Sequence, residues 1–116
     1  MNTQEAFNII WERAKIKKKA INEVDYTRPG CKYRADNGLA CFIGVLFPDE
    51  CYRPELEGQS INALLESNEL PSVLDSIDES FLILAQPIHD VDPVEDWEEN
   101  LRALASDFNL TIPGEC

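Results

Sequence analysis

The sequence lacks any apolar run long enough to cross a membrane. The clearest candidate is the segment 81–85, which is far shorter than the roughly 20 residues that span a bilayer as a helix. The first residues of the chain also lack the basic start, apolar middle and small-residue cleavage site of a secretory signal. The sequence therefore indicates that this is not a membrane protein, and we expect it to be cytoplasmic.

Several motifs that bind cofactors or metals are also missing. The chain contains no glycine-rich phosphate loop, no Walker motif and no dinucleotide fingerprint, so we expect no cofactor. The four cysteines form no C-x-x-C pair, and without an export signal we expect free thiols. Cys31, Cys41, Cys51 and the single histidine, His89, are zinc-ligand types, but their spacing is not that of a zinc finger. We therefore predict no metal site.

Basic residues are scarce in the second half of the chain. Residues 1–58 carry nine basic and nine acidic side chains, whereas residues 59–116 carry thirteen acidic ones and a single basic one, Arg102. The net charge of −12 therefore comes entirely from the second half. Such a surface repels the phosphates of DNA and RNA and attracts a basic protein. The alternative is that the acidity only keeps a small domain soluble.

The apolar content is sufficient for one hydrophobic core. A length of 116 residues suits a single domain, and 44% of the residues are hydrophobic, which is unlike a disordered chain. No linker or internal repeat divides the sequence. We predict a single α+β domain over residues 1–116, mainly helical with about four to five helices, and with one β-hairpin at about 31–47.

Apolar spacing near 3.6 residues and helix-end signals predict the helices. The first helix is expected to have Thr3 as its N-cap, and the last to have Asp92 as its N-cap and Pro93 in its first turn. Between them we expect a helix at about 60–67, a short segment from Pro71, and a helix near 81–88 that is kinked around Pro87. The residues predicted to face inward include Phe7, Ile10, Trp11, Ala14, Ile61, Leu64, Leu65, Phe81, Leu84, Ala85, Ile88, Trp97, Leu101, Leu104 and Phe108.

The predicted hairpin rests on Asn37-Gly38, the strongest two-residue hairpin signal. Apolar residues follow this turn as far as Phe47. In the register of a type I′ turn, Arg34 faces Cys41 across the two strands.

A candidate ligand-binding site lies on the hairpin and the segment that follows it. Cationic and aromatic side chains that lie close together can clamp a phosphate or stack on a base. The structural alternative is that the aromatic residues pack within the sheet and the arginines extend over it or form ion pairs. The candidate ligand-binding residues are Lys32, Tyr33, Arg34, Tyr52 and Arg53.

The stretch from His89 onward carries two further candidates. His89 lies beside Asp90, which could orient an imidazole as a general base, but no nucleophile motif accompanies it, and we favour a protein that is not an enzyme. The carboxylates that follow lack the glycine and ligand spacing of a calcium loop, and helix periodicity leaves them facing solvent. The candidate partner-binding residues are Asp90, Glu95, Asp96, Glu98 and Glu99.

One spaced set of residues is distinctive, and it comprises Tyr33, Arg34, Gly38, Cys41, Gly44, Leu46, Pro48, Asp49, Glu50, Tyr52, Glu57 and Gly58. This set resembles the signature of a family of small acidic bacterial and prophage proteins, which are mostly uncharacterised. Ile88-His89-Asp90 and Trp97 match the continuation of that pattern. The resemblance implies a phage origin, and small acidic phage proteins often bind and inhibit host machinery.

We therefore predict a small non-enzymatic binding protein of phage type that inhibits a host factor, such as a defence protein, without covalent chemistry. A basic host protein is the expected partner, reached through the acidic residues near the last helix. Two alternatives stay open. One is sequestration of a small anionic or nucleotide-like ligand near the hairpin, and the other is a small hydrolase that uses His89 and its neighbouring carboxylates.

Overall fold

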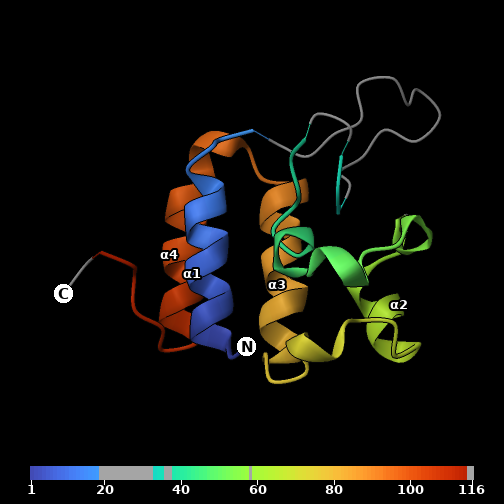
Figure 1. The fold of residues 1–116 in the computed structure, drawn as a ribbon. Coiled ribbons are helices and arrows are strands. Elements are labelled where there is room, and N and C mark those ends of the chain that lie inside the picture. Colours follow the sequence, from blue (N-terminus) through green and yellow to red (C-terminus); the bar gives the residue numbers. More distant parts are fainter. Residues whose placement is uncertain (19–32, 36–37, 58, 115–116) are drawn as a thin grey trace.

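The computed structural model describes residues 1–18, 33–35, 38–57 and 59–114, and within these ranges it contains four α-helices and no β-strand (Figure 1). The α-helices are α1 (Thr3–Ala14), α2 (Ile61–Glu66), α3 (Glu79–Asp90) and α4 (Trp97–Asp107). Five single 3₁₀ turns accompany them: η1 (Gly44–Leu46), η2 (Asp49–Cys51), η3 (Pro54–Leu56), η4 (Ser72–Leu74) and η5 (Val94–Asp96). None of the described helices is long and apolar enough to cross a membrane.

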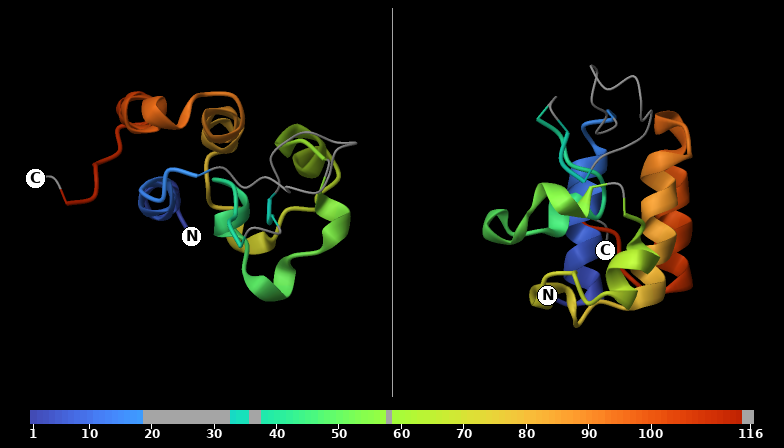
Figure 2. Two further views of the ribbon diagram at one scale, coloured as in Figure 1. Left: turned by 90° about the horizontal axis from the view of Figure 1, so that it is seen from above. Right: turned by 90° about the vertical axis from the view of Figure 1, so that its right-hand side faces the viewer.

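Three of the helices, α1, α3 and α4, form a bundle. Seen from above they stand in a triangle, and α2 lies on the far side of α3 (Figure 2). α4 runs in the opposite direction to α1 and α3, so the ends of α1 and α3 lie beside the start of α4 (Figure 1). This end of the bundle brings the end of α1 beside the connection from α3 to α4, two parts of the sequence that lie far apart.

The start of α1 is set by Asn2 and not by Thr3 as predicted. The Asn2 side chain accepts a hydrogen bond from the Glu5 backbone N–H at 2.8 Å, and the Glu5 carboxylate accepts one from the Asn2 N–H at 3.2 Å. This reciprocal capping box needs an acidic or amide residue three positions after the cap. Asn2 has Glu5 at that position, whereas Thr3 would have Ala6.

The last helix also begins later than its sequence signals predict. Asp92 and Pro93 precede the turn η5, and α4 starts at Trp97 with Asp96 as its N-cap. Asp92 instead accepts a hydrogen bond from the Asn100 side chain at 2.8 Å. The stripe of Trp97, Leu101 and Leu104 is buried as predicted.

Aromatic rings connect the parts of the core. Phe7 of α1 lies 5.9 Å from Trp11 and 6.4 Å from Phe81 of α3, measured between ring centroids. Phe42 lies 4.8 Å from Trp97 of α4. The segment before η1 is thereby packed into the helical bundle, although it was predicted to be a strand.

The predicted hairpin, and with it the α+β class, is wrong for the described residues. What remains of it is an isolated antiparallel bridge between Arg34 and Ala40. That pairing is one residue away from the predicted Arg34 to Cys41 register. Asn37 of the predicted turn lies outside the described residues.

Burial explains why the second strand does not form. Four neighbouring residues, Cys41, Phe42, Ile43 and Gly44, are all buried, as are Leu46 and Phe47. A strand alternates its side chains between two faces, and an isolated hairpin cannot cover both. The chain therefore coils into η1, which packs against α1.

Candidate partner-binding surface

The structure gathers most of the predicted ligand-binding residues around the carboxylate of Glu57, which was not itself among the predicted ligand-binding residues. Its Oε1 atom accepts a hydrogen bond from the Tyr33 backbone N–H at 2.8 Å. Its Oε2 atom accepts one from the Arg34 backbone N–H at 3.0 Å and one from the Tyr52 hydroxyl at 2.7 Å. A carboxylate at the centre of the cluster opposes the binding of a phosphate there.

The Arg34 guanidinium is already occupied by groups of the protein. It donates to the Phe47 carbonyl at 2.8 Å, pairs with the Asp49 carboxylate at 2.7 Å and stacks 4.9 Å above the Tyr52 ring. Arg53 is exposed, and Lys32 lies outside the described residues. This arrangement agrees with the structural alternative for Arg34, in which its cation stabilises the loop.

Both tyrosines of the cluster act as hydrogen-bond donors. Burial, followed by the hydrogen bond to Glu57, raises the pKa of Tyr52 to about 12. Burial also raises the pKa of Tyr33, whose hydroxyl donates to the Gln59 carbonyl at 2.7 Å. Both phenols therefore keep their protons at neutral pH.

His89 is enclosed by the core. Its ring has no exposed surface and lies 5.2 Å from the Phe42 ring and 5.4 Å from the Trp97 ring. Its Nδ1 atom is 2.8 Å from the Asp90 carboxylate, which also accepts a hydrogen bond from Gln86 at 3.0 Å. An imidazole walled in by two aromatic rings is a packing element, and a substrate would have no path to it in this conformation.

The cysteines that the structure describes do not provide a nucleophile beside His89. Cys41 and Cys51 are free thiols, while Cys31 and Cys116 lie outside the described residues. Burial raises the pKa of the Cys41 thiol to about 12, so it stays protonated and unreactive. Across the described ranges, no three histidine, cysteine or acidic side chains lie close enough together to hold a metal ion.

The predicted partner-binding carboxylates lie at the end of the bundle where α3 stops and α4 begins. Glu95, Glu98 and Glu99 are exposed, whereas Asp90 and Asp96 are half-buried. Glu98 forms an ion pair with Arg102 at 3.3 Å. The structure thus places all five residues at one end, with Asp90 held in the network around His89.

The sequence reasoning missed an exposed apolar surface on α3. We call it the α3 outer face, and it consists of Ile83, Leu84, Pro87 and Val91. Leu84 was predicted to point inward, yet 49% of it is exposed, and Val91 is 75% exposed. The inward positions of α3 are filled by Phe81, Leu82, Ala85, Ile88 and His89. One signal was available, because the helix is apolar on all sides, a pattern typical of helices that are covered all round.

A groove borders the α3 outer face on the side of α2. Its volume is about 410 Å³, and Ile83, Gln86, Pro87 and Asp90 of α3 form one wall. The opposite wall comprises Tyr33, Glu57, Gln59, Ser60, Ile61 and Asn62. The groove therefore combines apolar side chains with two carboxylates, Glu57 and Asp90.

No protein-family model, curated protein sequence or solved structure matches this chain.

Proposed function

We propose that this protein is a non-enzymatic binding protein that engages a basic protein through the α3 outer face and the carboxylates beside it. The exposure of apolar side chains on α3 next to acidic groups is the observation that carries the proposal. A contiguous exposed apolar patch is typical of an interaction site. Carboxylates around such a patch steer a basic partner toward it and exclude acidic ones.

The acidic half of the chain supports the same kind of partner. Residues 59–116 contain thirteen acidic side chains, and exposed ones lie in α2, before and within α3, and along α4. A positively charged protein, such as one that normally grips nucleic acid, is attracted by this overall negative charge. The resemblance to prophage proteins makes a cytoplasmic host factor the expected target, with inhibition as the outcome.

The two alternative functions receive less support. An anion near the segment that was predicted to form a hairpin would be repelled by the Glu57 carboxylate. The Arg34 side chain in this segment is already paired with Asp49. A hydrolase would need access to His89, whose ring is fully buried. Neither alternative has an observation of its own in its favour.

The proposal is tested by comparing charge variants in a quantitative capture experiment from bacterial lysate. The first variant combines Glu95→Gln, Glu98→Gln and Glu99→Gln. Its control combines Glu66→Gln, Asp75→Asn and Asp107→Asn, which neutralises three exposed carboxylates elsewhere and therefore changes the net charge equally. We expect a partner that is captured by the wild type and the control, and about tenfold less by the first variant at low salt.

A second pair of variants tests the apolar surface. Leu84→Gln with Val91→Gln removes two exposed apolar side chains of the α3 outer face, and Ile16→Gln with Val73→Gln is the control at exposed apolar sites elsewhere. We expect the same partner to be lost with the first pair and kept with the second. A partner that still binds both the Leu84/Val91 variant and the Glu95/Glu98/Glu99 variant would contradict the proposed surface.

A further inference from the structure

The α3 outer face contains a regular row of exposed apolar side chains. Ile83, Pro87 and Val91 follow one another at intervals of four residues, and all three are exposed. We call this row the α3 ridge, and Leu84 lies beside it with 49% of its surface exposed. Side chains at such intervals form the ridges by which one α-helix packs into the groove of another. With a rise of about 1.5 Å per residue, the α3 ridge is about 12 Å long, or about two helical turns.

The groove on the side of α2 runs next to the α3 ridge. Ile83 and Pro87 belong both to the ridge and to the wall of this groove, whose volume is about 410 Å³. A helix that packs along the ridge therefore has space on this side for a row of its own side chains. Glu57 and Asp90 line the same groove, so side chains that enter it meet negative charge, which favours cations.

Pro87 also leaves a backbone acceptor on this face. Proline has no N–H group and cannot donate the hydrogen bond that a helical residue makes to the carbonyl four positions before it. The Ile83 carbonyl therefore receives no such bond from position 87. Because Ile83 and Pro87 are both exposed, this acceptor lies on the outward side of α3. It favours a partner side chain that donates hydrogen bonds, and lysine and arginine are donors only.

Charge decides among the molecules that could cover the α3 ridge. A second copy of the chain would carry the same net charge of −12 and would be repelled. The phosphates of a nucleic acid would be repelled in the same way. Glu79 precedes the ridge by one helical turn and is exposed, and Glu57 and Asp90 lie along the groove. A helix with an apolar stripe flanked by lysine or arginine complements both the ridge and these carboxylates.

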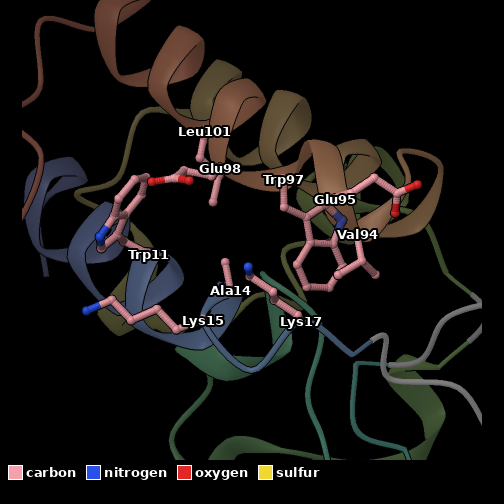
Figure 3. A pocket seen from close by; sticks show the side chains of 9 residues that line it. All are labelled: Trp11, Ala14, Lys15, Lys17, Val94, Glu95, Trp97, Glu98 and Leu101. Atoms are coloured by element: carbon pink, nitrogen blue, oxygen red, sulfur yellow. The ribbon is translucent and has the colours of Figure 1, made fainter.

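A second depression, between α1 and the start of α4, does not offer such a surface. Its volume is about 270 Å³, and Trp11 and Trp97 stand on opposite sides of it (Figure 3). Trp11 is only 8% exposed, and the Arg102 guanidinium lies 5.2 Å from its ring centroid. Trp97 is 1% exposed, and the Arg13 guanidinium lies 5.9 Å from its ring centroid. Since both indoles are already covered, the α3 ridge is better suited to receive an apolar stripe.

We propose that the partner of this surface presents a basic amphipathic α-helix, which packs along the α3 ridge and directs lysine or arginine side chains into the groove beside it. This inference rests on the proposed function, because it names the element by which a basic protein would bind the α3 outer face. The partner's apolar side chains then recur at helical spacing, and an extended basic segment binds weakly.

Three synthetic peptides of about four helical turns test the shape of the partner element. The first contains leucine and lysine in equal numbers, with the leucines at helical spacing. The second contains the same residues in strict alternation, the pattern of a strand, and the third has the helical pattern with glutamate in place of lysine. Binding to the protein is measured by fluorescence anisotropy of the labelled peptide at about 0.15 M salt. We expect a dissociation constant of about 20 μM for the first peptide, binding at least tenfold weaker for the second, and none for the third.

Variants of the protein locate the bound helix. Leu84→Gln with Val91→Gln should weaken the first peptide at least tenfold. Ile16→Gln with Val73→Gln is the matched pair at exposed apolar sites elsewhere and should weaken it less than twofold. Both variants should keep the circular dichroism spectrum of the wild type, because substitutions at exposed positions seldom disturb a fold.

The inference is overturned if the alternating peptide binds as tightly as the helical one, if neither binds, or if the Leu84/Val91 variant binds the helical peptide like the wild type. It is also overturned if the protein alone forms a dimer in analytical ultracentrifugation that the Leu84/Val91 changes abolish, since a second copy would then cover the ridge. The proposed function is judged separately. A lysate partner that requires Leu84 and Val91 would support the surface even where the alternating peptide binds equally well.

Discussion

Gly44 is the position where one added methyl group should disturb the most structure. A Cβ atom on Gly44 would lie 2.6 Å from the carbonyl carbon of Tyr33 and closer still to its oxygen. The obstacle is backbone and cannot rotate away. Relief of this overlap would move Tyr33, whose carbonyl accepts from the Cys41 N–H at 3.2 Å and whose N–H donates to Glu57 at 2.8 Å.

We expect Gly44→Ala to lower the free energy of unfolding by about 3 kcal/mol. Overpacking alone costs roughly 1–3 kcal/mol, and each weakened hydrogen bond adds about 1 kcal/mol. In urea denaturation followed by tryptophan fluorescence, this loss shifts the midpoint by about 2 M, taking a slope of about 1.5 kcal/mol per molar. The slope itself should stay unchanged.

Gly114→Ala is a control that adds a methyl group at an unfavourable backbone conformation but without steric overlap. Gly114 has a φ of 83° and no atom within 4 Å of the added Cβ, so its substitution tests conformation without contact and should cost about 1 kcal/mol. If Gly44→Ala were within about 0.5 kcal/mol of the wild type, Tyr33 would not pack on Gly44, and the described arrangement of the Glu57 cluster would be refuted.

Two further predictions concern buried titratable side chains. The free energy of unfolding should fall as the pH rises above 9, because Cys41, with its pKa raised to about 12, loses its proton first in the unfolded state. In urea titrations between pH 9 and pH 10, Cys41→Ala should flatten this slope by up to about 1.4 kcal/mol per pH unit, and an unchanged slope would count against the buried thiol. His89→Gln should cost about 2–4 kcal/mol, since it removes ring contacts with Phe42 and Trp97. Asp90→Asn, which keeps an acceptor for the imidazole, should cost clearly less in the same denaturation assay, and equal losses would argue against a packing role.

Helices with a one-sided apolar stripe could be predicted from the sequence. The spacing of Phe7, Ile10, Trp11 and Ala14 places them on one face of α1, and all four are buried. In α2, Ser60 caps the helix through its side chain, and Ile61 and Leu64 are buried. In both cases the local periodicity and the tertiary packing require the same conformation, so the sequence signal is sufficient.

The hairpin prediction was wrong because Asn37-Gly38 is a local turn signal, whereas the burial of the segment that follows depends on tertiary packing. Asn37-Gly38 specifies a turn type, but a two-residue turn says nothing about what covers the following segment. Phe42 and Ile43 are neighbours and both are fully buried, which the helical bundle permits and an isolated pair of strands does not. Tertiary packing therefore overrode the turn preference.

The exposed charges of the candidate site could be predicted from the sequence, but its hydrogen-bond network and its exposed apolar residues could not. The exposure of Glu95, Glu98 and Glu99 follows from their helical positions opposite the apolar stripe. The role of Glu57 does not, since its three hydrogen bonds join it to residues that lie up to 24 positions away. No spacing rule links such positions. The exposure of Leu84 was missed because α3 is apolar on both its inner and outer positions, so periodicity alone cannot say which side is covered.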